Sequence, residues 1–511
     1  MVKNLSALLD GLEVLEVRGD LMTRVSGVSY DSRRTGEGDL FVAVRGVRHD
    51  GSGFIGEALK RGARAVLAES APGNEISVPF VRVSDSRSAL ARVAANFFDD
   101  PSRNLQLIGV TGTNGKTTTT LLLESILKEA GHSVGVIGTL GYRWADQERT
   151  APMTTPESLD LQRFFHEMRQ DRVTHLVMEV SSHALALGRV SGCVFRAGLF
   201  TNLSQDHLDF HSSMEEYFEA KSLLFSDYLG PESSGSVSVI NADDPFGQRL
   251  IDQQANYVWS YSASGRNARV WVKDVELNGS GIRAELATPM GDLGIRSPLL
   301  GRLNLYNVLA AATTALALGI PGEVVAEGLR TLSSVDGRLQ QVPVPPDRAF
   351  QVVVDYAHTP DAMEKSLNCL REMTPERLIV VFGCGGDRDR GKRPLMGGIA
   401  ARLGDLVILT SDNPRSEVPE KILQDVEPGV LAEELPFVEP RDKSRPERGY
   451  TVEVDRKRAI ELALSWARPG DVVFIGGKGH ETYQIIGKQV FQFDDRQVVQ
   501  AYFDNMGIST S

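Results

Sequence analysis

The segment IGVTGTNGKTTTT, residues 108–120, combines residue types that together can hold a phosphate group. Gly112 and Gly115 allow a tight turn and a close approach of the backbone to an anion. Lys116 adds a positive charge, and Thr117 adds a hydroxyl that can bind Mg²⁺. These residue types in this order predict a loop that binds the phosphates of a nucleotide.

The flanking sequence predicts the strand and the helix that such a loop needs. LQLIGV at 105–110 predicts a buried strand, and TTTTLLLESILKEA at 117–130 has apolar residues at helical spacing and stops at Gly131. Bound phosphates would lie at the positive end of this helix. Val110 stands where the commonest loop of this kind has its first glycine, so the prediction depends on the Gly–Lys–Thr core. A glycine-rich turn without a ligand is the alternative.

Two further polar clusters each follow an apolar run. THLVMEVSSH at 174–183 contributes Glu179, and TNLSQDHLDFH at 201–211 contributes Asp206, His207, Asp209 and His211. A carboxylate and an imidazole near the Thr117 hydroxyl are suitable ligands for Mg²⁺ that bridges phosphates, whereas any single histidine could be structural. Lys221, in EAKSLLF, lies on a predicted helix, and its spacing alone favours a solvated side chain.

Composition limits the class of protein. A chain of 511 residues predicts about three domains. The formal net charge of −12 argues against nonspecific binding of nucleic acid, although a local basic pocket remains compatible with it. The first twenty residues interrupt their leucines with acids, unlike a signal peptide, and no stretch reaches the roughly 20 apolar residues of a membrane span. The three cysteines have no paired spacing, so we expect no disulfide framework or zinc site. The cytosol, hence a cytoplasmic location, is the simplest expectation.

The pattern of apolar runs predicts an α/β protein of three domains. Residues 1–103 read as a small α/β domain. Residues 104–335 alternate near-continuous apolar strands with helices, which predicts a central, mostly parallel sheet. Residues 336–511 repeat that pattern and predict a second, Rossmann-like sheet. Because ligands bind at the carboxyl ends of strands in open α/β sheets, the polar loops there are the candidate sites.

Other polar positions have weaker signals. Ser32, Arg48 and His49 could hold an anionic ligand or merely border a strand. Asn304 could read a base edge or satisfy backbone groups near a helix start. Arg415, in DNPR, lies in a proline-stiffened loop that suits bidentate binding of a carboxylate, and a plain surface turn is the alternative. EPRDKSRPERG at 439–449 predicts an exposed loop without chemistry of its own.

Nine segments together resemble one family along essentially the whole chain. In order they are TGTNGKTT, MEVSSH, TNLSQDHLDFH, EAKSLLF, GRLN, DYAHTPD, GCGGDRDRGKRP, SDNPR and GGKGHE. Their order and spacing resemble the Mur ligases, and among these the ligases that add the third amino acid of the peptidoglycan stem. The resemblance implies an N-terminal domain for the UDP end of the substrate (1–103), a central ATPase (104–335) and a C-terminal domain for the incoming amino acid (336–511).

The resemblance also implies roles for individual residues. It makes Lys116, His207 and Lys221 catalytic, and it implies a CO₂-derived carbamate on Lys221 that would bind Mg²⁺ together with Thr117, Glu179 and His207. The implied ATP site comprises Gly112, Thr113, Asn114, Gly115, Lys116, Thr117, Thr118, Asn304, Arg338, Asp355 and His358. The implied site for the UDP-linked substrate comprises Ser32, Val47, Arg48, His49, Thr154, Thr155, Ser181 and Arg189. The implied amino-acid site comprises Arg388, Asp412, Asn413, Pro414, Arg415, Gly477 and Glu481. Leu187 stands where the family often has glutamine, so we assign it no hydrogen bond to the substrate.

The implied reaction joins an amino acid to a carboxylate with ATP as co-substrate and Mg²⁺ as cofactor. The γ-phosphoryl group would pass to the D-glutamyl γ-carboxylate of UDP-N-acetylmuramoyl-L-alanyl-D-glutamate, and the amine of meso-diaminopimelate would attack the resulting acyl phosphate. DNPR is the version of its motif associated with diaminopimelate. A lysine-adding ligase, a folylpolyglutamate synthase and a regulatory nucleotide-binding protein are the alternatives. We expect a monomer that binds no nucleic acid and does not insert into membranes.

Overall fold

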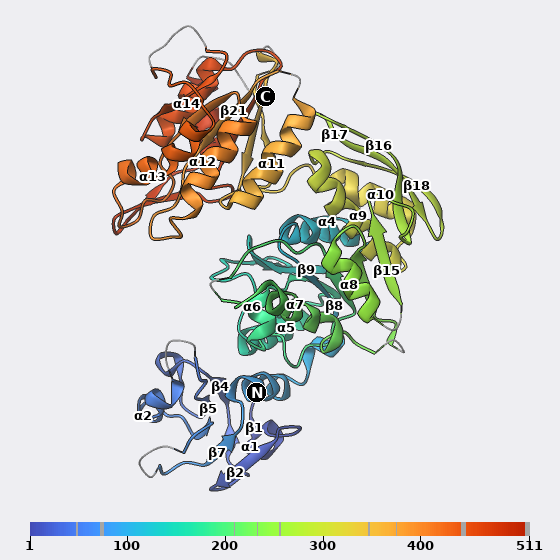
Figure 1. The fold of residues 1–511 in the computed structure, drawn as a ribbon. Helices are drawn as coiled ribbons and strands as arrows, with labels where there is room; N and C mark the ends of the chain where they lie inside the picture. Colours follow the sequence, from blue (N-terminus) through green and yellow to red (C-terminus); the bar gives the residue numbers. More distant parts are fainter. Residues whose placement is uncertain are drawn as a thin grey trace. The chain divides into compact units, whose positions relative to one another are not determined.

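The computed structural model describes residues 1–46, 50–71, 76–208, 210–231, 234–254, 257–345, 348–374, 376–440 and 446–505. These residues form two compact units, one of Met1–Val270 with Ala310–Gly328 and one of Trp271–Leu309 with Leu329–Ser511. Figure 1 shows that both units combine sheets with helices, which confirms the predicted α/β class. The predicted boundaries near residues 103 and 335 stay a prediction.

The first unit begins with a five-stranded sheet. Its strand order is β2 (Val14–Arg18), β7 (Phe80–Val83), β6 (Ala65–Ala68), β5 (Asp39–Val42) and β4 (Gly27–Ser29). β2 runs antiparallel to β7, and the other neighbours are parallel. Helices α1 (Leu5–Leu8) and α3 (Ser86–Phe97) share a core with one face of this sheet, and α2 (Ile55–Lys60) shares a core with the other. Alternate residues of the short strands therefore point into two separate apolar layers.

A larger, mostly parallel sheet follows in the first unit, as predicted. Its strands in the first unit are ordered β11 (Gln147–Arg149), β10 (Gly141–Trp144), β9 (Val134–Gly138), β12 (His175–Glu179), β8 (Gln106–Thr111), β13 (Ala197–Phe200), β14 (Val237–Asn241) and β15 (Val258–Ser262). In this spatial order, every pair of neighbours from β9 through β12, β8, β13 and β14 to β15 is parallel. The accompanying helices are α4 (Lys116–Glu129), α5 (Ser158–Gln170), α6 (Ser182–Ala186), α7 (Met214–Ser226) and α8 (Pro245–Gln253). The near-continuous apolar runs are buried because helices cover the sheet.

The second unit contains an antiparallel sheet of β16 (Val270–Asn278), β17 (Gly281–Thr288) and β18 (Gly291–Ser297). Helices α9 (Gly301–Ala317) and α10 (Gly322–Thr331) have residues in both units. The second unit also contains a sheet ordered β19 (Gln340–Val342), β20 (Gln351–Asp355), β24 (Val472–Gly476), β21 (Leu378–Phe382), β22 (Leu406–Leu409) and β23 (Gly449–Val452). All its neighbours are parallel except β19 with β20.

Helices cover both faces of this second parallel sheet (Figure 1). One core contains residues of α11 (Pro360–Met373), α12 (Lys392–Leu403) and α13 (Pro419–Ala432). The opposite core contains residues of α14 (Arg456–Trp466) and α15 (Asp495–Asp504). A short hairpin, β25 (Tyr483–Ile486) and β26 (Gln489–Gln492), precedes α15. This doubly wound arrangement confirms the predicted Rossmann-like sheet. None of the described helices is long and apolar enough to cross a membrane.

Candidate active site

The predicted phosphate-binding loop joins the central strand β8 to the start of α4. Gly115 has a φ of +87° and immediately precedes the helix. Gly112 has a φ of +141°, and a Cβ atom there would lie 1.9 Å from the Thr201 hydroxyl oxygen. The backbone of the loop therefore requires both glycines. Asn202 holds the loop through two hydrogen bonds. Its backbone carbonyl accepts from the Thr113 amide at 2.8 Å, and its side-chain oxygen accepts from the Asn114 amide at 3.0 Å.

The Lys116 ammonium lies over this loop. Its Nζ donates to the carbonyls of Gly112 and Thr113 at 2.9 and 2.8 Å. Helix α4 begins at this same residue, so its first backbone amides and the ammonium are close together at the carboxyl end of β8. This is the combination that stabilises a bound phosphate.

The Thr117 hydroxyl and the Glu179 carboxylate are in direct contact. Thr117 Oγ1 donates to Glu179 Oε1 at 2.9 Å, and both side chains are buried. The Thr139 amide and hydroxyl donate to the same carboxylate at 2.9 and 3.1 Å. The start of α4 and the end of β12 thus bring a hydroxyl and a carboxylate together, and Mg²⁺ prefers oxygen ligands of this kind.

Lys221 is buried, contrary to what its spacing alone favours. Only 1% of it is exposed, and its Nζ donates to the Gly112 carbonyl at 2.9 Å. Burial lowers the pKa of Lys221 well below its ordinary value, and the nearby charge of Lys116 lowers it further. A buried amine biased towards its neutral form is the species that can add CO₂, so the residue fits the implied carbamate.

His207 and His211 belong to the polar group predicted near Mg²⁺, and the structure places both beside a further histidine of the first unit, His183. The rings of His183 and His207 are 4.9 Å apart between centroids, and His183 and His211 are 5.8 Å apart. His207 Nε2 lies 3.5 Å from Asp206 Oδ2. Among the described residues, no group of three or more histidine, cysteine or acidic side chains is arranged to hold a metal. Asp209 lies outside the described residues.

The predicted contacts to the muramoyl dipeptide gather beside Glu179. Thr155 Oγ1 donates to the Glu179 carbonyl at 2.9 Å and accepts from the Ser181 amide at 3.1 Å. Thr154 and Thr139 share a hydroxyl hydrogen bond of 3.1 Å. Arg189 donates to the Thr155 carbonyl at 3.2 Å and forms an ion pair of 2.9 Å with Glu157. The structure therefore brings Thr154, Thr155, Ser181 and Arg189 to one edge of the central sheet.

The predicted uridine site is described only in part. Ser32 is buried, and its hydroxyl donates to Glu57 Oε2 at 2.8 Å. Val47, Arg48 and His49 lie outside the described residues.

Four predicted nucleotide-side residues lie in the second unit. Asn304 is buried on α9 and donates to the Leu300 carbonyl at 2.9 Å. Asp355, at the end of β20, accepts from the Leu339 amide at 2.7 Å and the Ser366 hydroxyl at 3.0 Å. Burial raises the pKa of Asp355. The Arg338 guanidinium lies 5.0 Å from the Tyr356 ring centroid, and His358 Nδ1 lies 2.8 Å from the Tyr356 carbonyl.

The predicted amino-acid residues converge at the carboxyl ends of β22 and β24. Asn413 Nδ2 donates to Glu481 Oε2 at 2.8 Å, and both Asp412 and Asn413 are buried. Gly477, with a φ of +111°, is packed against Asp412, whose Oδ2 would lie 2.5 Å from an added Cβ. Arg388 is exposed in the neighbouring loop after β21.

Arg415 adopts a left-handed backbone conformation, with a φ of +52°, which is unfavourable for a non-glycine residue. The hairpin β25–β26 holds it there: the Arg415 amide donates to the Ile485 carbonyl at 3.0 Å, and the Arg415 carbonyl accepts from the Gly487 amide at 2.7 Å. Its Nη1 donates to the Gly386 carbonyl at 2.7 Å. The remaining N–H groups of the guanidinium are suited to a carboxylate.

Comparison with known proteins assigns this architecture. Three family models match in sequence order: "Mur ligase family, catalytic domain" over residues 24–98, "Mur ligase middle domain" over 110–315, and "Mur ligase, glutamate ligase domain" over 337–479. The chain belongs to the Mur ligase family. A UDP-N-acetylmuramoyl-L-alanyl-D-glutamate–2,6-diaminopimelate ligase of Gloeobacter violaceus is 48% identical over 93% of this chain and 92% of its own length.

Further relatives of this Mur ligase cover nearly the whole chain. The ligase of the same name from Geobacter sulfurreducens is 43% identical over 96% of this chain and 97% of its own. A solved structure of a ligase of that name has a TM-score of 0.72 at 32% identity and covers all of both chains. A folylpolyglutamate synthase of Mycobacterium tuberculosis, in complex with ADP, shares the fold at 16% identity, with a TM-score of 0.59 and 76% of this chain covered.

Several contacts in this Mur ligase could not be found from residue spacing. Glu157 and Asn202 are polar residues of the first unit that hold Arg189 and the phosphate-binding loop. Lys478, inside the quoted GGKGHE segment, is fully buried and donates to Glu481 Oε2 at 3.2 Å. Its position in a glycine-rich loop after a strand was the available signal.

Glu417 connects helix α12 and the loop after β21 with the loop that carries Arg415. Arg393 is fully buried, and its Nη1 and Nη2 donate to the Glu417 carboxylate at 3.0 and 2.8 Å. Glu417 also accepts from the Asp387 amide at 2.7 Å. Chiefly through its hydrogen bonds with Arg393, the pKa of Glu417 falls from 4.5 to about 2. Glu417 thus stabilises the fold above pH 4.5, and this contribution is lost as pH falls towards 2.

Glu417→Gln should loosen the loop that carries Arg415, because it removes the charge that holds Arg393. We expect the KM for diaminopimelate to rise about tenfold while the KM for ATP stays unchanged. The free energy of unfolding should fall by about 1–3 kcal/mol. Steady-state kinetics and urea unfolding measure the two effects. Glu433→Gln, which alters an exposed ion pair with Arg402, is the control. A uniform loss of kcat with unchanged KM values would contradict this positioning role.

Proposed function

We propose that this chain is an ATP-dependent ligase that joins meso-diaminopimelate to UDP-N-acetylmuramoyl-L-alanyl-D-glutamate, a step of peptidoglycan precursor synthesis. The near-full-length similarity to ligases of that name carries the proposal. The phosphate-binding loop supports the ATP requirement, and Arg415 supports the choice of amino acid. We further propose that the protein acts in the cytoplasm as a monomer, with domains at 1–103, 104–335 and 336–511.

In the first unit, we assign phosphoryl transfer to Lys116 and the surrounding loop. The α4 amides and the Lys116 ammonium would bind the β- and γ-phosphates and offset the charge that develops as the γ-phosphoryl group moves to the D-glutamyl γ-carboxylate. Arg189, with Thr155 and Ser181, would orient that substrate. Attack by the amine on the acyl phosphate would then form the amide and release phosphate.

Thr117 and Glu179 fit a Mg²⁺ ion, and we propose that they hold it with His207 and a carbamate on Lys221. Bound Mg²⁺ would supply positive charge beside the phosphate oxygens. The buried hydroxyl–carboxylate pair provides oxygen donors, and the neutral form of Lys221 favoured by burial permits carbamate formation. The carbamate would replace the amine, which donates to the Gly112 carbonyl, by an anion with two oxygen atoms.

In the second unit, Arg388, Asp412, Asn413, Pro414, Arg415, Gly477 and Glu481 are assigned to the incoming amino acid. Diaminopimelate differs from lysine by a carboxylate at the far end of its chain, and the Arg415 fork can bind it bidentately. Asn304, Arg338, Asp355 and His358 are assigned to the nucleotide. Bound lysine would leave the Arg415 guanidinium without that anionic partner. We therefore expect the protein to discriminate strongly between diaminopimelate and lysine.

Arg415→Ala tests this assignment. The KM for diaminopimelate should rise about 100-fold or more, because two charge-assisted hydrogen bonds are lost, while the KM values for ATP and the UDP-substrate change little. Good activity with lysine is not required, since rejecting one substrate and binding another need different contacts. Arg402→Ala on α12, an arginine paired with Glu364 and Glu433, is the control. An unchanged KM for diaminopimelate in Arg415→Ala would refute the role of this loop in selectivity.

A further inference from the structure

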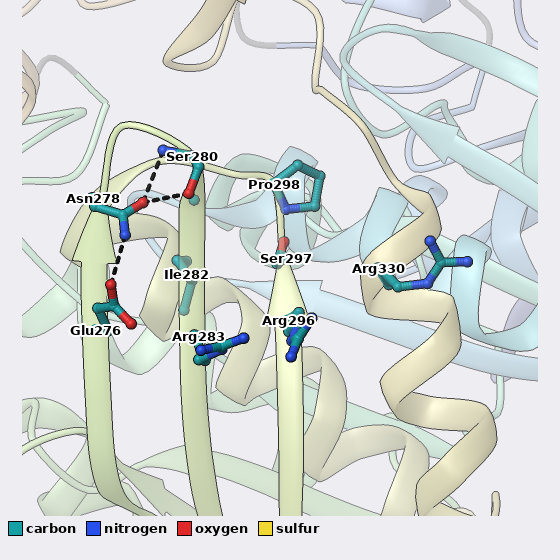
Figure 2. Close-up of a pocket in the computed structure, with 10 residues that line it drawn as sticks. Glu276, Asn278, Ser280, Ile282, Arg283, Arg296, Ser297, Pro298 and Arg330 are labelled. Carbon is teal, nitrogen blue, oxygen red and sulfur yellow. Dashed lines mark hydrogen bonds between the residues drawn. The ribbon is translucent and has the colours of Figure 1, made fainter.

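A cavity of about 410 Å³ lies in the second unit, on the antiparallel sheet β16–β18. Figure 2 shows Arg283 of β17 and Arg296 of β18 side by side at this cavity, with Arg330 on the neighbouring helix. None of these arginines belongs to the sites assigned above. Three guanidinium groups and one carboxylate, Glu276, line the cavity, so its charged side chains carry an excess of positive charge.

The strand register places two like charges directly opposite each other. Arg283 pairs with Arg296 across β17 and β18, so both side chains point to the same face of the sheet. Like charges in this position destabilise a sheet. Among the residues that the structure describes, neither guanidinium has a hydrogen-bond or ion-pair partner. The fold therefore maintains a repulsive pair that an anion between the two side chains would relieve.

Among the described residues, no neighbouring carboxylate forms an ion pair with Arg283 or Arg296. Glu276 is the register partner of Arg283 on β16, but its Oε1 accepts from Asn278 Nδ2 at 2.9 Å (Figure 2). Glu285 and Asp292 are both ion-paired with Lys273, and neither lines the cavity. The Asn278 oxygen is likewise used within the turn, where it accepts from the Ser280 amide at 2.9 Å and hydroxyl at 2.6 Å.

We propose that this cavity binds a small anion that bears phosphate groups. Phosphate oxygens point in several directions and can accept from guanidinium groups on two strands and a helix, whereas a carboxylate has two oxygens in one plane. The cavity volume lies in the usual range of small-molecule sites, about 300–1,000 Å³. Binding would place negative charge between Arg283 and Arg296 and stabilise the sheet. This site is independent of the proposed ligase function.

Inorganic pyrophosphate is the probe for this site. Isothermal titration calorimetry and thermal unfolding of the full chain should be compared for the unaltered protein, Arg283→Gln, Arg296→Gln and the control Lys457→Gln. The control removes one exposed positive charge from the same unit but not from the cavity. Titrations with potassium chloride at matched ionic strength account for general screening. Pyrophosphate bound at the phosphate-binding loop contributes equally to all four proteins, so differences between them report on the cavity.

We expect Arg283→Gln and Arg296→Gln each to weaken one pyrophosphate site about tenfold or more, and Lys457→Gln to leave it unchanged. Without pyrophosphate, the two cavity variants should unfold at the same or a higher temperature, because the repulsion across β17 and β18 is removed. Identical pyrophosphate binding by all four proteins would overturn the proposal. The proposal would also be overturned if Arg283→Gln reduced co-sedimentation with vesicles of phosphatidylcholine and phosphatidylglycerol but left pyrophosphate binding unchanged. The ligand would then be a lipid surface.

Discussion

Replacing Lys116 with alanine should lower kcat by about 10³-fold or more while leaving the fold intact. The Lys116 ammonium lies over the loop between β8 and α4, where its Nζ contacts the Gly112 and Thr113 carbonyls. Removing it would leave the charge that develops during phosphoryl transfer without its nearest cation. The side chain makes no contribution to an apolar core, so we expect little change in stability.

Release of ADP and formation of the ligated product should be measured together for Lys116→Ala. Lys128→Ala is the matched control, because Lys128 lies on the same helix α4 but is exposed and paired with Glu124. Thermal unfolding establishes that the variants are folded. Near-normal turnover of folded Lys116→Ala would refute the assignment of this loop to ATP.

The ligase activity of Lys221→Ala should be lower than that of the unaltered protein by a factor of about 100 or more. This variant cannot form the anionic group proposed to hold Mg²⁺. Short carboxylic acids such as acetate should restore part of the activity by occupying the space left by the side chain. Because Lys221 is buried and contacts the Gly112 carbonyl, only a small molecule can occupy the space that its side chain leaves. Labelled bicarbonate should give a carbamate signal in the ¹³C NMR spectrum of the unaltered protein and none in Lys221→Ala.

Lys221→Arg separates the carbamate from a purely cationic role. Arginine places a permanent positive charge next to the Gly112 carbonyl and does not form the carbamate, so we expect this variant to be inactive and not rescued by carboxylic acids. Substantial activity in Lys221→Arg would show that a buried cation is sufficient and would exclude the carbamate as an essential group.

The local part of the architecture could be predicted from the sequence. The strand β8, the loop and helix α4 are adjacent in the chain, and each has its own signal: an apolar run, two glycines and helical periodicity. The helix begins at Lys116, one residue before the predicted start at Thr117. The predicted parallel sheets also appear, since near-continuous apolar strands require cover on both faces.

Contacts between distant segments could not be predicted in this way. The spacing of Lys221 on its helix favours a solvated side chain, which is wrong. Its burial involves a contact with Gly112, which is far away in the sequence. The ion pair of Arg393 with Glu417 joins helix α12 to the loop after β22, two segments that are separate in the sequence. The left-handed conformation of Arg415 depends on backbone hydrogen bonds with the later hairpin β25–β26. The resemblance to Mur ligases suggested several of these positions, but only the three-dimensional contacts give their physical basis.

The reaction of the purified protein with ATP, UDP-N-acetylmuramoyl-L-alanyl-D-glutamate and one amino acid tests the central claim most directly. Products should be separated and identified by mass spectrometry, with diaminopimelate and lysine in parallel reactions. The proposed function predicts a UDP-linked tripeptide, together with ADP and phosphate, in the reaction with diaminopimelate and little or no product with lysine. Equal use of lysine, or ATP hydrolysis without any ligated product from diaminopimelate, would contradict it.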